Sequence, residues 1–357
     1  MSSYYLIAPG NGSKVLNHLL DGFIAGAGEP VGIIRNKKDL PSLVKQRIAF
    51  AVQLDHLGQC PEMNSILSLL HTRGENALLG SSAVVFTVSP NELFTKSYTQ
   101  HLIFLLNRLG CSFPGHPLIE AVEGLRNFRT WQKTLDLSLR EIAWELSKRL
   151  GDRFMQDRRP QFENPRVLAL HAGSRKTSNT VMLWDMIKAH LSGWDMEELN
   201  VDKGMVMDCR GCDFRECRHF SQQDSCFYGG VVVKEILPAV ERADVIVWIC
   251  PNYNDAISAN LMAVINRMTA LYRKISFYQK TFFAVIVSGN SGSDSVAKQL
   301  IGALNVNKGF RLPAKFSLMA IANDPGDIRN IPDIPEQARL FALHMMGEMR
   351  GDHFKIT

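Results

Sequence analysis

Hydroxyl, amide and cationic side chains crowd into one short segment that follows an apolar run. The run is Arg166–His171, and the segment GSRKTSNT (residues 173–180) precedes a helical pattern. A phosphate group needs backbone N–H groups at a helix N-terminus, and hydroxyls and cations assist them. The same residue types also favour the N-cap of any ordinary helix. The segment alone therefore predicts either an anion-binding loop or a generously capped helix.

Two further polar loops follow apolar runs in the same half of the chain. Residues 244–250 (DVIVWIC) lead into PNYNDAISA, and residues 281–288 (TFFAVIVS) lead into GNSGS. The loop at residues 251–259 offers an aromatic ring and backbone hydrogen bonds, which a flat ring system could use. Its alternative interpretation is a Pro/Asn turn with Tyr253 packed on the surface. The loop at residues 289–293 is rich in residues that tolerate unusual backbone angles.

The elements that must position these loops alternate between apolar strands and helices. Such alternation predicts an α/β protein with a parallel sheet covered on both faces. The carboxyl ends of parallel strands meet at one edge, where ligands bind in open sheets. The first half repeats the alternation less clearly, with strands expected at Tyr4–Ala8, Pro30–Ile34, Arg47–Gln53 and Ala83–Val88 and a long helix at Phe128–Leu150. We therefore expect two tandem domains, residues 1–150 and 166–357, joined by a polar linker at 151–165.

The two halves also share a short similarity in sequence. Residues 84–91 read VVFTVSPN and residues 245–252 read VIVWICPN, and each is followed by a helix that carries an Asn-Arg pair. Either the chain is a tandem duplication or two buried strands resemble each other by composition alone. A duplication would make the N-terminal domain a degenerate copy that keeps its scaffold and has lost its ligand loops.

Four of the seven cysteines lie close together between the expected first and third strands of the second domain. The set is Cys209, Cys212, Cys217 and Cys226, spaced as C-x2-C-x4-C-x8-C within the insertion 209–226. Four thiolates in one loop could hold an iron–sulfur cluster or zinc. They could also be reduced or reversibly oxidised thiols, or form a disulfide. The sequence leaves these alternatives open.

Charge and hydropathy exclude two classes of partner. The 40 basic and 35 acidic residues give a formal charge of +5, and the basic residues form no stripe of the kind that nucleic-acid binding requires. The longest apolar runs have the length of strands, far short of a membrane span, and no signal segment is seen at the N-terminus. We expect a cytoplasmic protein that binds neither nucleic acid nor membrane.

Taken jointly, the three loops resemble those of the NADPH-dependent FMN reductase and iron–sulfur flavoprotein family of the flavodoxin-like superfamily. The resemblance covers about Arg166–Ile321 and rests on the order and spacing of GSRKTSNT, CPNYNDAISANLM and SGNSGS. The first loop is one residue shorter than is usual in that family. Cys250 stands where the family usually has Ser, and Met262 where it often has Lys. The fold that this implies is a doubly wound parallel sheet of flavodoxin-like type.

The resemblance also implies a cofactor and its site. The FMN phosphate would be held by Ser174, Arg175, Lys176, Ser178, Asn179 and Thr180. The isoalloxazine would be lined by Pro251, Asn252, Tyr253 and Asn254, and its other edge capped by Ser288, Gly289, Asn290 and Gly292. No catalytic residue outside these loops is expected, because hydride transfer to a flavin needs no acid–base side chain.

The implied activity is an NAD(P)H oxidoreductase that passes electrons through FMN to a small acceptor, such as a quinone or free flavin. One alternative is an electron-transfer flavoprotein that serves a partner protein, with an iron–sulfur cluster on Cys209, Cys212, Cys217 and Cys226. Another is a flavodoxin-like module with no enzymatic activity. Since the family usually binds FMN near a subunit interface, we expect a homodimer.

Overall fold

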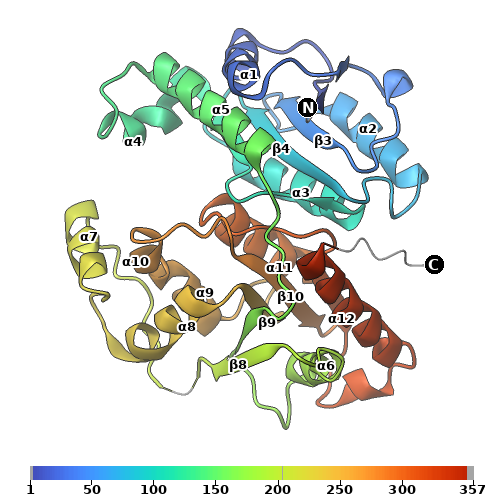
Figure 1. The fold of residues 1–357 in the computed structure, drawn as a ribbon, viewed down its shortest axis with the longest axis vertical. Helices are drawn as coiled ribbons and strands as arrows, with labels where there is room; N and C mark the ends of the chain where they lie inside the picture. The colour runs from blue at the N-terminus through green and yellow to red at the C-terminus, as the bar shows by residue number, and fades with distance from the viewer. Residues whose placement is uncertain (1–2, 203, 352–357) are drawn as a thin grey trace. The chain divides into compact units, whose positions relative to one another are not determined.

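The computed structural model describes residues 3–202 and 204–351, which divide into two compact units. The first unit ends at Arg158 and the second begins at Arg159. Each unit has its own sheet with helices packed on it (Figure 1). The last helix of the first unit runs to Gln156, so the start of the segment expected as a linker is helical.

The N-terminal unit has a parallel sheet in the order β2-β1-β3-β4-β5, with β6 also paired to β4. Its strands are β1 (Tyr4–Ile7), β2 (Gly32–Ile34), β3 (Arg47–Gln53), β4 (Ser81–Val88), β5 (Cys111–Ser112) and β6 (Leu118–Ala121). Its helices are α1 (Lys14–Ala27), α2 (Pro61–Thr72), α3 (Thr95–Arg108), α4 (Arg129–Gln132) and α5 (Leu139–Gln156).

The C-terminal unit has a parallel sheet in the order β11-β10-β9-β7-β8. Its strands are β7 (Arg166–His171), β8 (Asp195–Asn200), β9 (Val245–Pro251), β10 (Thr281–Ser288) and β11 (Ser317–Ile321). Its helices are α6 (Asn179–Lys188), α7 (Phe214–Gln222), α8 (Leu237–Arg242), α9 (Ala259–Arg267), α10 (Thr269–Tyr272), α11 (Ser293–Leu300) and α12 (Ile334–Arg350).

Both units have the strand order of the flavodoxin fold. Counted within each unit, the strands lie in the order 2-1-3-4-5, which defines the flavodoxin-like type of doubly wound sheet. The predicted fold class is therefore confirmed, and the two sheets are compatible with tandem domains.

The central strands of the C-terminal sheet are apolar because both of their faces are covered. Val245, Val247 and Ile249 of β9 belong to a core cluster with residues of α6 and α12. The alternate residues Ile246, Trp248 and Cys250 are also fully buried, on the opposite face. Within the described residues, no helix is both long enough and apolar enough to cross a membrane.

Two details differ from the sequence-based expectations. The helix expected over Phe128–Leu150 is broken between α4 and α5, because Ser138 and Glu141 form a capping box that begins α5. The shared sequence pattern aligns β4 with β9, yet β4 is the fourth strand of its unit and β9 the third. The pattern therefore compares strands that are not topologically equivalent, although the two sheets share one strand order.

Candidate functional site

The segment between β7 and α6 places free backbone donors at the carboxyl edge of the sheet. Ser178 is the N-cap of α6, and its Oγ accepts a hydrogen bond from the Val181 N–H at 3.3 Å. The Ser174 Oγ accepts from the Lys176 N–H at 3.2 Å, which tightens the turn. Among the described residues, the N–H groups of Asn179 and Thr180 have no acceptor. These orphan donors at a helix N-terminus attract an anion.

The side chain of Asn179 attaches this helix start to the segment after β11. Its Nδ2 donates to the carbonyl oxygens of Ala322 at 3.2 Å and Asp324 at 2.8 Å. Its Oδ1 accepts from the N–H of Gly326 at 2.9 Å. The amide is thus committed to holding the neighbouring segment, while its own N–H stays free.

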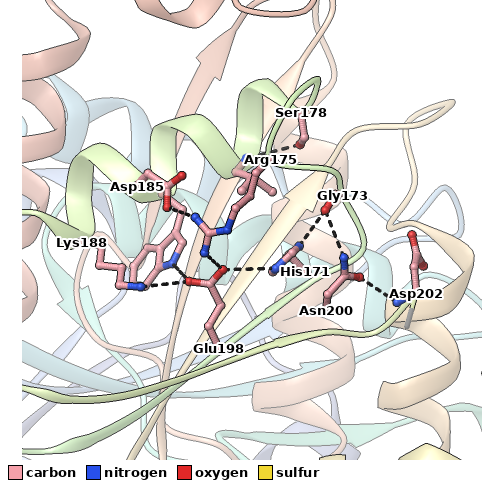
Figure 2. Close-up of polar contacts among 11 residues, drawn as sticks. His171, Gly173, Arg175, Ser178, Asp185, Lys188, Glu198, Asn200 and Asp202 are labelled. Carbon is pink, nitrogen blue, oxygen red and sulfur yellow. Dashed lines mark hydrogen bonds and ion pairs between the residues drawn. The ribbon is translucent and has the colours of Figure 1, made fainter. Parts of the chain in front are cut away.

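Arg175 is engaged by two carboxylates (Figure 2). Its guanidinium donates to Asp185 Oδ1 of α6 at 2.5 Å and to Glu198 Oε1 of β8. Lys176, the other cation of the segment, is exposed, and its side chain makes no ion pair within the described residues. Of the two cations expected at the phosphate, Lys176 is therefore the one whose charge is not already paired.

Glu198 is the centre of a polar network beneath the segment. Its carboxylate accepts from Trp184 Nε1 and Lys188 Nζ of α6, each at 3.3 Å, and lies 3.3 Å from His171 Nε2 of β7. These hydrogen bonds and cations, with that of His171 the largest contribution, lower the pKa of Glu198 to about 2. Glu198 is therefore ionised at neutral pH even though its side chain is only 14% exposed.

The second and third loops are held to each other by Asn252. Its Nδ2 donates to Ser288 Oγ at 3.1 Å and to the Ser291 carbonyl oxygen at 2.9 Å. Beyond it, Tyr253 and Ala256 exchange backbone hydrogen bonds across a tight turn with positive φ at Asn254 and Asp255. Asn and Asp tolerate that left-handed conformation better than most residues.

This pair of loops leaves an exposed aromatic ring and one buried acceptor without a hydrogen bond. Tyr253 is 60% exposed, and Asn254, Gly289 and Asn290 are exposed with it. Pro251 and Ser288 are buried at the ends of β9 and β10. The Oδ1 of Asn252 is buried and makes no hydrogen bond to a described residue. The second and third loops therefore meet at one edge and retain an acceptor without a donor.

Gly292 allows the two loops to approach each other. Its φ of +83° lies in the left-handed region, and a Cβ at this position would collide with Asp255 Oδ1 and lie 2.9 Å from Asn252 Nδ2. Only glycine fits this combination of angle and space.

The four clustered cysteines are free thiols on one segment. Cys209 is exposed, Cys212, Cys217 and Cys226 are half-buried, and all four are free thiols. Over residues 3–202 and 204–351, no three His, Cys, Asp or Glu side chains are arranged to hold a metal ion. An iron–sulfur cluster or a zinc ion on Cys209, Cys212, Cys217 and Cys226 is therefore not shown, and this assignment stays a prediction.

The base of the cysteine segment is fixed by a buried arginine of α9. Arg267 is 2% exposed, and its guanidinium donates to the carbonyl oxygens of Gly229 at 2.7 Å and Met207 at 3.5 Å. Asn266 Nδ2 donates to Asp208 Oδ1 at 2.9 Å. These bonds hold both ends of the segment against the helix that follows the second loop.

Sequence reasoning missed His171 and Glu198. His171 is the last residue of the expected first strand, and the sequence analysis gave it no role. Glu198 lies in β8, a strand with a polar pattern (DMEELN) that the sequence analysis did not locate. The adjacent acidic residues Glu197 and Glu198 in this short polar stretch were the available signal.

Comparison with known proteins agrees with the resemblance of the C-terminal half. Residues 165–324 match the family model described as NADPH-dependent FMN reductase. No curated protein matches the chain. The resemblance of the C-terminal half to this family, inferred from its three loops, is therefore confirmed.

Several solved structures are similar to this chain. The NAD(P)H:quinone oxidoreductase from Methanothermobacter marburgensis is 16% identical, with 51% of this chain and 99% of that chain covered and a TM-score of 0.39. An azoreductase from Bacillus anthracis is 14% identical over 53% and 100% of the two chains, with a TM-score of 0.38. RosB with a bound formylated riboflavin-5'-phosphate intermediate is 14% identical over 52% and 79%, with a TM-score of 0.42. Similarity at this level carries no argument about activity.

Proposed function

We propose that the C-terminal unit binds FMN at the carboxyl edge of its sheet and that the protein is an NAD(P)H-dependent oxidoreductase. The observation that carries the proposal is the meeting of three loops on a 2-1-3-4-5 sheet within the segment that matches the FMN reductase family. One loop offers free N–H donors, and the other two are tied together by Asn252. Ligands of open α/β sheets bind at this edge.

The donors after β7 suit the phosphate end of FMN. The N–H groups of Asn179 and Thr180 supply hydrogen bonds at the positive end of α6. In the proposed complex the hydroxyls of Ser174, Ser178 and Thr180 and the cation of Lys176 complete the phosphate site. Arg175 stands in the same segment, but its guanidinium is already paired with Asp185 and Glu198.

The loops after β9 and β10 suit the ring system. In the proposed complex Pro251, Asn252, Tyr253 and Asn254 line the isoalloxazine, and Ser288, Gly289, Asn290 and Gly292 cap its other edge. The unsatisfied Oδ1 of Asn252 is a buried acceptor for which a ligand N–H would be a partner. Tyr253 offers an exposed aromatic face for stacking.

The residues of the site position the cofactor and shield it rather than take part in proton transfer. When bound, FMN accepts a hydride from a nicotinamide and releases electrons to an acceptor singly or in pairs. Burial raises the pKa of the Cys250 thiol, so this residue stays protonated behind the second loop and forms part of the apolar wall. The proposed acceptor is a small molecule such as a quinone or flavin, and the proposed location is the cytoplasm. We also propose a homodimer, which light scattering would test.

The first test is flavin retention and turnover by the full chain. Protein incubated with FMN and passed through a desalting column should retain about one FMN per chain, because one site of this kind is proposed in each chain. The loaded protein should then oxidise NADPH or NADH when a quinone is added. A protein that stays colourless after FMN is added would overturn the proposal.

A matched pair of variants localises the site. Thr180→Val removes a hydroxyl from the predicted phosphate site and should weaken FMN binding about 10-fold to 150-fold, the value of one hydrogen bond to a charged group, about 1.5–3 kcal/mol. Thr281→Val removes a buried hydroxyl at the opposite edge of the same sheet, where β10 begins, and should leave FMN binding unchanged. Equal effects of the two variants would argue against the carboxyl edge as the site.

A further inference from the structure

The polar network around Glu198 joins β7, β8, α6 and the first loop. Glu198 belongs to β8, His171 to β7, Arg175 to the loop, and Trp184 and Lys188 to α6. Figure 2 shows the His171 ring, the Arg175 guanidinium and the Lys188 ammonium all directed at the Glu198 carboxylate. The Glu198 carboxylate thus lies within hydrogen-bond or ion-pair distance of four side chains.

The network also fixes the backbone of the loop itself. His171 Nδ1 lies 3.0 Å from the Gly173 carbonyl oxygen, and Asn200 Nδ2 donates to the same oxygen at 3.4 Å. The Gly173 carbonyl oxygen therefore accepts from a side chain of β8 and lies within hydrogen-bond distance of a side chain of β7. A Cβ on Gly173 would lie 2.8 Å from Ser178 Oγ, so the loop closes tightly onto the N-cap of α6.

Arg175 contributes to the same closure. Its guanidinium spans Asp185, one turn and a half into α6, and Glu198 on β8. Planar guanidinium groups that satisfy two carboxylates are held in one geometry. Moving Arg175 to a phosphate would leave Glu198, with a side chain only 14% exposed, short of one of its partners.

We propose that Glu198 is a positioning residue for the FMN phosphate, acting through His171 and Arg175 to fix the loop 173–178. This inference rests on the proposed function and deepens it. Arg175 acts here as a tie between β8 and α6, and the phosphate is bound by the α6 N–H groups, the loop hydroxyls and Lys176. Glu198 touches neither the phosphate nor the ring.

A double-mutant cycle with two flavins tests the assignment. The dissociation constants of FMN and riboflavin are measured by flavin fluorescence for the wild type, Glu198→Gln, Arg175→Gln and the double variant. Each single variant should weaken FMN binding about tenfold and riboflavin binding less than twofold, because riboflavin lacks the phosphate. The double variant should be no weaker than either single variant, since both remove one shared constraint.

Glu197→Gln is the matched control. Glu197 neighbours Glu198 on β8 but pairs with the exposed Arg242 at 3.1 Å, away from the loop. This variant should bind both flavins as the wild type does.

Three outcomes would overturn the inference. If Arg175→Gln weakens FMN binding while Glu198→Gln tightens it, Arg175 is itself a phosphate ligand. If both flavins weaken equally, Glu198 only maintains the fold. If the single variants leave FMN binding unchanged, the network has no part in binding. A wild type that binds neither flavin refutes the proposed function and the inference with it, whereas a wild type that binds FMN leaves the variants to decide the inference alone.

Discussion

Replacing Gly292 with alanine should disrupt the junction of the second and third loops more than its backbone angle alone explains. At φ +83° a Cβ costs about 1–2 kcal/mol in any setting. The Cβ would also displace Asp255 Oδ1 and press on Asn252 Nδ2. Asp255 is exposed and can rotate away, so the further cost is that of about one or two hydrogen bonds, roughly 1–2 kcal/mol. We expect a total loss of about 2–4 kcal/mol.

Gly326→Ala is the matched control for this substitution. Gly326 has a φ of +94°, and a Cβ there would have no heavy atom within 4 Å. It should therefore lose only the backbone contribution, about 1–2 kcal/mol. The difference between the two variants isolates the contact with Asn252 and Asp255.

Urea unfolding of the full chain, followed by tryptophan fluorescence, measures the free energy of unfolding of both variants. Trp184 and Trp248 are fully buried in the C-terminal unit and report its transition. FMN binding should weaken in Gly292→Ala and persist in Gly326→Ala, because only the first position lies in the proposed ring site. Equal loss of stability in the two variants, with FMN binding intact in both, would refute the reasoning.

Three further predictions concern other parts of the chain. The pKa of Glu198 is lowered to about 2 in the fold, whereas it is about 4.3 in an unfolded chain. The ionised carboxylate therefore stabilises the folded protein by about 2 kcal/mol after solvent screening. This stabilisation is present above about pH 5 and is lost as the pH falls from about 4.3 towards 2. Urea midpoints should show this loss in the wild type and in Glu197→Gln but not in Glu198→Gln, and identical profiles would contradict the assignment. Ser138→Ala removes the capping box of α5 and should lower the free energy of unfolding of the N-terminal unit by about 1 kcal/mol. Ser68→Ala, an exposed mid-helix change, should lower it little. Equal urea midpoints for the two variants would argue against the cap. Arg267→Met should make limited proteolysis between Met207 and Gly229 roughly tenfold faster, because about 1.4 kcal/mol of local stability is lost. The control is Arg242→Met, which removes only an exposed ion pair. Equal proteolysis rates for the two variants would show that Arg267 does not hold the segment.

The break between α4 and α5 shows where periodicity misleads. Apolar spacing over Phe128–Leu150 is consistent with one long helix, and it predicted one. The capping box of Ser138 and Glu141 restarts the helix, and this pair is visible in the sequence as S-x-x-E. The VVFTVSPN and VIVWICPN patterns fall on β4 and β9, the fourth and third strands of their units, so the similarity of sequence does not by itself pair equivalent strands.

The cysteine segment shows what a count of ligand-type residues leaves open. Four thiols within a short stretch are sufficient in number for a cluster, and the sequence carries no information on their convergence. In the structure they lie at different degrees of exposure on a segment held by Arg267, and no group of described side chains is arranged around a metal. Convergence depends on the path of the whole segment.

The sequence by itself determined the parallel sheet of the C-terminal unit and the position of three polar loops at its carboxyl edge. Strand-length apolar runs and the residues that end them are local properties, so they can be read along the chain. Only the tertiary structure decided the partners of the loop residues. Arg175 meets Glu198 because β7 and β8 pair in a register that sets Ala169 opposite Glu198. Register depends on contacts distant in sequence, and it determines which charges lie free to meet a ligand and which are already paired.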